Sequence, residues 1–376
     1  MKAFKTLGQA LALSALAFGT ATGSVEARGP STLNGQISLK GQPVSGSSIT
    51  LWQAQAGQSP KQLSTQRSNK SGAFSVKVRA RQGVVHYLVA EGGDIGGSSA
   101  DQLTMLTVLG GDEHQQVTIN ELTTVGSVWP NAQLLEGTAL EGSQSALMIG
   151  SSQVENLVDQ STGRFGATLL KSTNLLNSET AARMNVLSDL IALCGQPQQS
   201  QACYRLLALT NSENTLSAMT SIACQPWKNA GALYQLFQSA YPINKSTELR
   251  TTATAPYLLF QPKSFSLSLV FNGGGALGLG KLMFDGKGSL WSGTNWMPGS
   301  QSGVVNNIGG GVTHFSPGGT PLSPAISGTT AKASTVWAGE PASQKNMPGL
   351  VRSTTWLECS TSTMAKLSGQ PPLMET

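Results

Sequence analysis

The stretches LMFDGKGSLW (Leu282–Trp291) and VTHFSPGGTPL (Val312–Leu322) decide the expected fold of the C-terminal part of the chain. Each combines apolar and aromatic residues at strand-like spacing with a glycine-containing turn. The pattern predicts three short strands, at Lys281–Asp285, Ser289–Trp296 and Gly311–Ser316. Such a meander is typical of one β-propeller blade, and a propeller needs several blades around one channel. We therefore expect an incomplete propeller of about one blade, over residues 264–325.

Residues 31–119, upstream of this blade, alternate between apolar and polar residues as strands do. The expected strands are Gly35–Leu39, Ser48–Gln53, Ala73–Val78, Val84–Ala90, Thr104–Leu109 and Gln116–Ile119. Turn sequences separate them, including Lys40–Pro43 and Asn69–Gly72. Several short strands at close spacing predict a small antiparallel β-sandwich.

Residues 120–245 change to a helical period. One stripe predicts a helix with Ser178 as its N-cap; its apolar members are Met184, Leu187, Leu190, Ile191 and Cys194. Thr210 and Glu213 predict a capping box for a second helix. A third helix is expected over Ala230–Ala240, before Tyr241 and Pro242. Residues 246–263 are interpreted as a linker, so the fold class is multidomain α and β: sandwich, helical domain and partial propeller.

The two ends of the chain differ in sequence pattern from the parts between them. Lys2 and Lys5, a short apolar run and Ala27 at a cleavage position predict a signal peptide over residues 1–27, and hence export to the periplasm or outside the cell. After Gly328 the blade-like pattern stops, although a one-base shift of the reading frame would restore it. Residues 326–376 are expected to be an irregular tail, out of frame or naturally disordered, and the chain truncated or frameshifted.

The chain has four cysteines, Cys194, Cys203, Cys224 and Cys359. In an exported protein, Cys194 and Cys203 are expected to form a disulfide that closes a short loop between two helices. A metal site is the weaker alternative, because there is no CxxC motif and the histidines His86, His114 and His314 are far from the cysteines in sequence. Cys224 is interpreted as a small buried apolar residue, and Cys359 has no assigned role.

Two resemblances add to this interpretation. The pattern from Gly35 to Trp52, with the turn Asn69–Phe74, resembles carboxypeptidase-regulatory-like (prealbumin-like) modules, which are usually accessory. The stretch Val117–Ser127, the two-cysteine helical unit and the blade together resemble bacterial exported proteins with an NHL-type, streptogramin-lyase-like propeller. In that class a histidine with a metal ion performs the lyase reaction, but here His314 is the one blade histidine, so no catalytic residue is carried over.

The expected function is inferred from the types and spacing of the candidate catalytic residues. Single carboxylates without paired spacing predict no acid–base pair; they are Glu121, Glu136, Glu141 and Glu155. We therefore expect no catalytic, cofactor-binding or metal-binding residue and no cofactor. The leading hypothesis is a non-catalytic exported binding or surface protein with an unknown extracellular or cell-envelope ligand. The alternatives are a lyase or hydrolase whose catalytic blades are missing, and a carbohydrate-binding sandwich using Trp52 and Tyr87.

Two partner classes are not expected. The net charge is +5 but the basic residues are scattered, so no nucleic-acid partner is predicted. After the leader no apolar stretch is long enough for a transmembrane helix.

Overall fold

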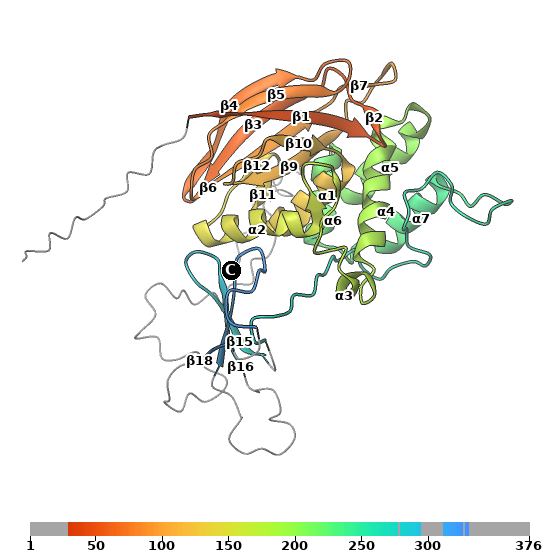
Figure 1. Ribbon diagram of the computed structural model, residues 1–376. Coiled ribbons are helices and arrows are strands. Elements are labelled where there is room, and N and C mark those ends of the chain that lie inside the picture. The colour runs from red at the N-terminus through yellow and green to blue at the C-terminus, as the bar shows by residue number, and fades with distance from the viewer. Residues whose placement is uncertain (1–28, 277–278, 295–310, 326–327, 331–376) are drawn as a thin grey trace, which may run out of the picture.

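The computed structural model describes residues 29–276, 279–294, 311–325 and 328–330, in which small sheets and seven α-helices alternate along the chain (Figure 1). The N-terminal part contains two four-stranded sheets. The first consists of β10 (Gln116–Ile119), β1 (Ser31–Leu39), β2 (Gln42–Pro43) and β5 (Ala73–Val78). The second has the order β4 (Gln58–Arg67), β3 (Ser48–Gln55), β6 (Val84–Glu91) and β9 (Thr104–Gly110).

The sequence predicted six of these strands and missed β4 and the two-residue β2. Strand β4 is an edge strand whose side chains are mostly exposed, so it lacks the apolar alternation that marks a half-buried strand. The prediction of a purely antiparallel arrangement is also corrected, because β1 and β10 pair in parallel. The chain crosses from β9 in the second sheet to the edge of the first, where it continues in the direction of β1.

The second sheet is covered on both faces. Every residue of β6 except Glu91 is buried, as is every residue of β9 except Gly110. One face of this sheet meets the first sheet, and helices lie against the other (Figure 1). A single apolar core runs from Leu33 in β1 to Phe265 beyond the last helix.

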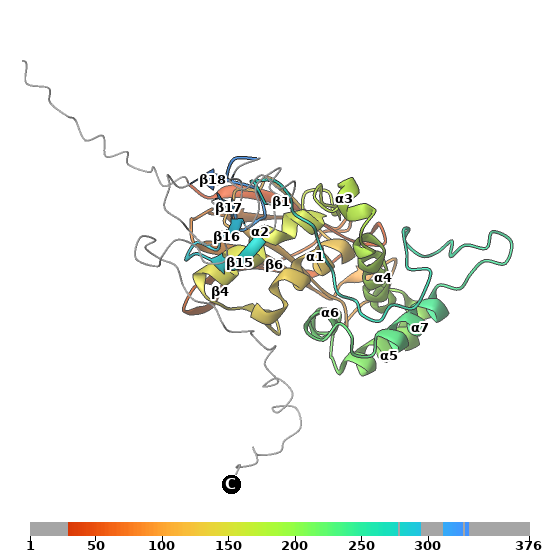
Figure 2. The ribbon, with the colours of Figure 1, turned by 90° about the horizontal axis from the view of Figure 1, so that it is seen from below.

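The helices that cover the sheet follow it in sequence. They are α1 (Glu121–Asn131), α2 (Gln144–Leu157), α3 (Ser172–Leu175), α4 (Thr180–Ala192), α5 (Ser200–Thr210), α6 (Thr215–Cys224) and α7 (Ala230–Ala240). Helices α1, α2 and α6 contact β9, and α4 and α7 pack behind them (Figure 2). Short 3-10 turns lie at Ala132–Leu134, Leu193–Gly195 and Pro197–Gln199. Three short antiparallel hairpins, each made of two two-residue strands, complete the described elements of this part. They pair β7 (Asp94–Ile95) with β8 (Ser98–Ser99), β11 (Leu135–Glu136) with β12 (Ala139–Leu140), and β13 (Val158–Asp159) with β14 (Arg164–Phe165).

The predicted helix bodies are confirmed, including Ala230–Ala240, but two predicted caps are wrong. The N-cap of α4 is Glu179, and Ser178 instead donates its hydroxyl to the carbonyl of Asn174. The capping box of α6 is made by Asn214 and Ser217, and Thr210 is the last residue of α5. In both places the helix begins one to four residues later than the sequence pattern indicated.

The C-terminal described part is a separate four-stranded antiparallel meander. Its strands are β15 (Leu279–Phe284), β16 (Leu290–Thr294), β17 (Gly311–Phe315) and β18 (Thr329–Thr330), in that order. The three predicted strands are present with slightly different ends; residues 295–310 and 331–376 lie outside the described residues. The carboxylate of Asp285 accepts the backbone N–H groups of Lys287 and Ser289, which closes the predicted glycine turn.

The meander is attached to the helices at two places. The side chains of Gln153 and Asn156 in α2 donate to the carbonyls of Pro317 and Gly318, both at 2.7 Å. Residues 264–270 run in extended form along α4 and α3: Ser268 exchanges hydrogen bonds with Thr180, and the N–H of Val270 donates to Asn174. These contacts hold the meander beside the helical layer (Figure 1).

Candidate functional site

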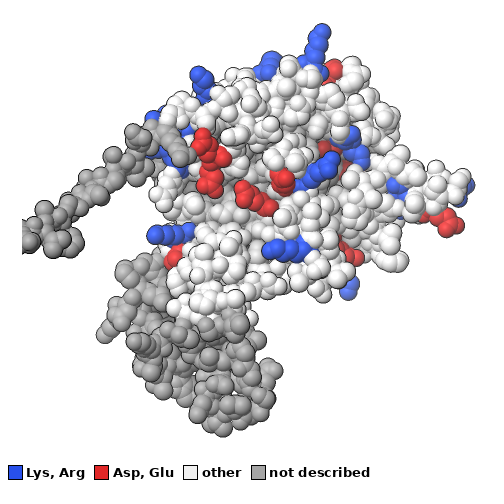
Figure 3. Space-filling model, in the orientation of Figure 1, with Lys and Arg blue, Asp and Glu red and all other residues white. Residues whose placement is uncertain are grey.

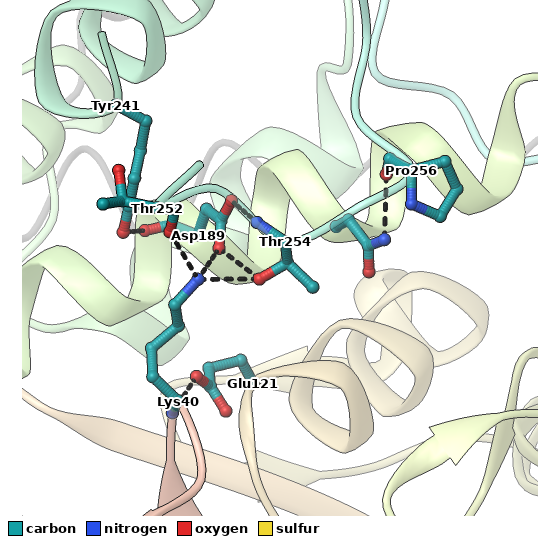
Figure 4. A network of polar contacts seen from close by, with 8 residues as sticks. Lys40, Glu121, Asp189, Tyr241, Thr252, Thr254 and Pro256 are labelled. Carbon is teal, nitrogen blue, oxygen red and sulfur yellow. Dashed lines mark hydrogen bonds and ion pairs between the residues drawn. The ribbon is translucent and has the colours of Figure 1, made fainter. Parts of the chain in front are cut away.

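A buried polar cluster lies where the first sheet, the helices and the loop after α7 meet (Figure 4). Its cation is Lys40, in the two-residue turn between β1 and β2. Lys40 and Gly41 have φ values of 48° and 76°, as a tight hairpin of this type requires. A non-glycine residue rarely adopts a positive φ, so this conformation of Lys40 costs free energy. The contacts of the lysine side chain offset that cost.

The ammonium group of Lys40 is fully engaged. It donates to Asp189 Oδ1 at 2.6 Å, to Thr254 Oγ1 at 2.7 Å and to the carbonyl of Thr252 at 3.3 Å. Asp189 lies in α4 and its side chain is completely buried, whereas the Lys40 side chain is 26% exposed. Thr254 also donates to Asp189 through its N–H at 2.8 Å and its hydroxyl at 2.7 Å. A buried carboxylate with three hydrogen-bond donors, one of which is a cation, is satisfied both in charge and in hydrogen bonds.

A second carboxyl group, Glu121, begins α1 beside the same turn. Its Oε1 accepts the backbone N–H of Lys40 at 2.5 Å, and the residue is only 7% exposed. Burial raises the pKa of Glu121 to about 7, although hydrogen bonds from its own N–H and from Lys40 act in the opposite direction. The group therefore changes its protonation state near neutral pH.

Tyr241, which follows α7, closes the cluster on its other side. Its hydroxyl donates to the main-chain carbonyl of Asp189 at 2.9 Å, and its ring lies 5.3 Å from the Lys40 ammonium. Burial raises the pKa of Tyr241, so it stays a neutral donor. Arg250 donates in turn to the carbonyl of Tyr241 at 2.5 Å. The cluster thus connects β1, α1, α4, α7 and the loop through Thr254.

The arrangement positions structural elements rather than a reacting group. Each polar atom of Lys40 and Asp189 named above points to another protein atom, and the two residues are 149 positions apart in sequence. The described residues contain no group of three or more metal-ligating side chains. Chemically, the cluster forms a charge-assisted connection between distant segments, with one carboxyl group that titrates near pH 7.

The predicted disulfide is present. Cys194 and Cys203 are bonded across the connection between α4 and α5, and both are buried. The prediction for Cys224 is wrong, because the residue is only half-buried and is not a free thiol. Cys359 lies outside the described residues. A small hollow beside the disulfide is lined by Gln102, Pro197 and Tyr204, among other residues.

The aromatic and histidine candidates of the sequence lie apart from the cluster. Tyr87 is fully buried and stacks on Trp52 with ring centroids 6.3 Å apart, so this pair is part of the packing rather than an exposed platform. His314 stacks on Trp291 at 3.6 Å, and the indole N–H donates to Asp285. Burial lowers the pKa of His314, which favours the neutral ring.

Sequence reasoning missed the cluster. The sequence pattern presents Glu121 only as a single carboxylate and Lys40 only as a turn residue. One signal was available: Asp189 interrupts the apolar run VLSDLIA in α4, and a carboxylate on an otherwise buried helix requires a partner. The identity of the partner is a matter of tertiary structure.

Two further features of the described residues are the distribution of basic side chains and the character of the helices. Lys and Arg side chains on the described part of the face in Figure 3 are scattered and form no continuous stripe. Among the helices of the described ranges, none has the length and apolar character needed to cross a membrane.

The comparisons with known proteins do not assign the chain to a family. No family model matches the sequence, and no curated protein matches it. Among solved structures, a 9R-lipoxygenase from Cyanothece PCC8801 aligns with a TM-score of 0.17 and 7% identity. The alignment covers 78% of this chain and 41% of the lipoxygenase chain. A TM-score of this size carries no argument about fold or function.

Proposed function

We propose that the protein is an exported, non-catalytic binding or surface protein that presents a β-sheet module on a helix-backed platform. The attachment of the β15–β18 meander to the helical layer supports this proposal most directly. Two side-chain amides of α2 hold the turn at Pro317 and Gly318, and residues 264–270 follow α3 and α4. A module attached in this way keeps a fixed orientation for a ligand.

We further propose that the meander is one blade of a partial NHL-type, streptogramin-lyase-like propeller, and that residues 31–119 are a prealbumin-like accessory sandwich. The matching strand–turn–strand sequence around Asp285 supports the first proposal, and the turn at Asn69 supports the second. Sequencing the gene from the codon of Gly328 onward tests the first. A missing base followed by further blade sequences would support the propeller proposal, and a restored frame without blade sequences would contradict it. An unchanged sequence would mean that the chain is truncated after one blade.

Export is tested with the intact chain and a variant with a disrupted leader, Leu13→Arg/Leu16→Arg. We expect the wild-type protein in the envelope or medium, beginning at Arg28 by N-terminal sequencing, and the variant inside the cell. Protease treatment of intact cells then reports surface display. Wild-type protein that stays inside the cell with Met1 retained would overturn the proposal.

A further inference from the structure

An exposed apolar patch lies around the start of α7. Its three large side chains are Trp227, Leu259 and Phe260, which are 67%, 71% and 82% exposed. Most apolar surface residues occur singly and need no explanation. These three belong to two segments that the fold brings together, and a tryptophan is among them.

Contacts between the two segments place them side by side. The N–H of Phe265 donates to the carbonyl of Pro226 at 2.8 Å, directly before Trp227. The hydroxyl of Tyr234 donates to the carbonyl of Leu258 at 2.9 Å, directly before Leu259. The Gln261 side chain lies against Gly231, where a Cβ would meet its Nε2 at 2.9 Å. The segment 258–265 therefore runs back along the start of α7.

The patch has a basic border. Lys228 follows Trp227, Lys263 follows the Leu259–Phe260 pair, and both lysines are exposed. Neither residues 226–231 nor residues 257–265 contain a carboxylate. The patch lies with α7 at the end of the molecule away from the β15–β18 meander, in both views (Figures 1 and 2).

We propose that this patch docks the protein on an anionic membrane surface. Tryptophan, phenylalanine and leucine side chains enter the boundary between lipid headgroups and acyl chains, and the neighbouring lysines meet lipid phosphates. The charge pattern favours a lipid surface over a second copy of the chain. In a two-fold symmetric dimer through this patch, the lysines of one copy would find no carboxylate in residues 226–231 or 257–265 of the other.

The test is vesicle flotation with the full mature chain. Vesicles of equal parts phosphatidylglycerol and phosphatidylcholine are compared with pure phosphatidylcholine vesicles, at low and high salt. We expect the protein to float with the anionic vesicles, and at least about tenfold less strongly with neutral vesicles or at high salt. Equal flotation with both vesicle types, or none, would overturn the proposal.

Variants separate the two contributions. Trp227→Ser/Phe260→Ser and Lys228→Glu/Lys263→Glu should each reduce flotation at least about tenfold, with an unchanged circular dichroism spectrum. The matched control is Leu176→Ser, an 83% exposed leucine directly after α3, which should float like wild type. If the control loses binding equally, or if the apolar variant instead abolishes a dimer seen by light scattering without lipid, the proposal is wrong.

Discussion

Lys40 and Asp189 form an ion pair in which the two partners have very different exposure to solvent. Replacing Lys40 by methionine leaves a completely buried carboxylate without a cation, which costs about 3 kcal/mol of unfolding free energy. In an Asp189→Asn background, the same replacement should cost less than about 1 kcal/mol, because the neutral amide still accepts from Thr254. Urea unfolding of the four proteins in this double-mutant cycle measures the coupling. Equal costs in the two backgrounds would show that the pair contributes nothing.

Glu121 makes stability depend on pH. Its pKa is raised from 4.5 to about 7, so between these values the folded protein binds more protons than the unfolded chain. The unfolding free energy should therefore fall as pH rises from 4.5 to 7, by at most roughly 3 kcal/mol at about 1.4 kcal/mol per pH unit. Glu121→Gln should remove this fall and be more stable than wild type at pH 8, but not at pH 4.

Another titrating group acts in the opposite direction within this window. Burial and the nearby Arg81 lower the pKa of His86, so its contribution to stability increases as pH rises toward 6.5. The difference between wild type and Glu121→Gln at each pH cancels the His86 contribution, because both proteins retain that histidine. A difference that does not change between pH 4 and 8 would contradict the role assigned to Glu121.

At the scale of elements, the disulfide joins α4 to α5 across a sequence separation of nine residues. Loop-closure entropy predicts that a cross-link of this length stabilises the folded protein by about 3 kcal/mol. The double variant Cys194→Ser/Cys203→Ser should lower the unfolding free energy by this amount, whereas Ser200→Ala within the loop should leave it nearly unchanged. A double variant as stable as wild type would show that the short turns at Leu193–Gln199 already fix the connection.

Elements also show where sequence reasoning succeeds. Strands β5 and β10 and helix α7 were predicted with their observed ends, because each combines a clear apolar period with strong flanking turn residues. Strand β4 was missed because an exposed edge strand carries no such period. The helix starts at Asn120 and Asn214 were missed because their capping boxes close with threonine and serine side chains instead of glutamate or glutamine.

The Lys40 cluster was beyond prediction for a different reason. Lys40 is separated from its partners in the cluster by 81 to 214 residues, and no local pattern predicts which distant segment a turn will contact. Local periodicity in the sequence predicted individual strands and helix bodies. The contacts between these elements depend on how they pack in the folded protein.

At the scale of the whole molecule, the attachment of the meander can be weakened without altering the core. Gln153→Ala/Asn156→Ala removes two hydrogen bonds to the turn at Pro317 and Gly318, worth about 1 kcal/mol each. We expect proteolytic cleavage within residues 271–330 to become roughly tenfold faster, while the fragment containing the core is cut at the wild-type rate. Asn177→Ala, which removes an exposed local hydrogen bond after α3, is the matched control. Unchanged cleavage of the double variant would mean that other contacts, such as those of residues 264–270 and of the Gly288 turn with α2, hold the meander.

The two-sided burial of β6 and β9 governs the order in which the chain can fold during synthesis. When residue 119 leaves the ribosome, both large sheets have all their strands, yet one face of the second sheet still lacks its helices. That face is completely covered only after α6 has emerged. The hydrogen bond from Lys40 to Thr254 can form only after Thr254 has emerged. Until α6 has emerged, the nascent protein carries a partly uncovered apolar surface, because α1 and α2 cover only part of this face. We therefore expect chaperones to bind the growing chain during this interval of synthesis.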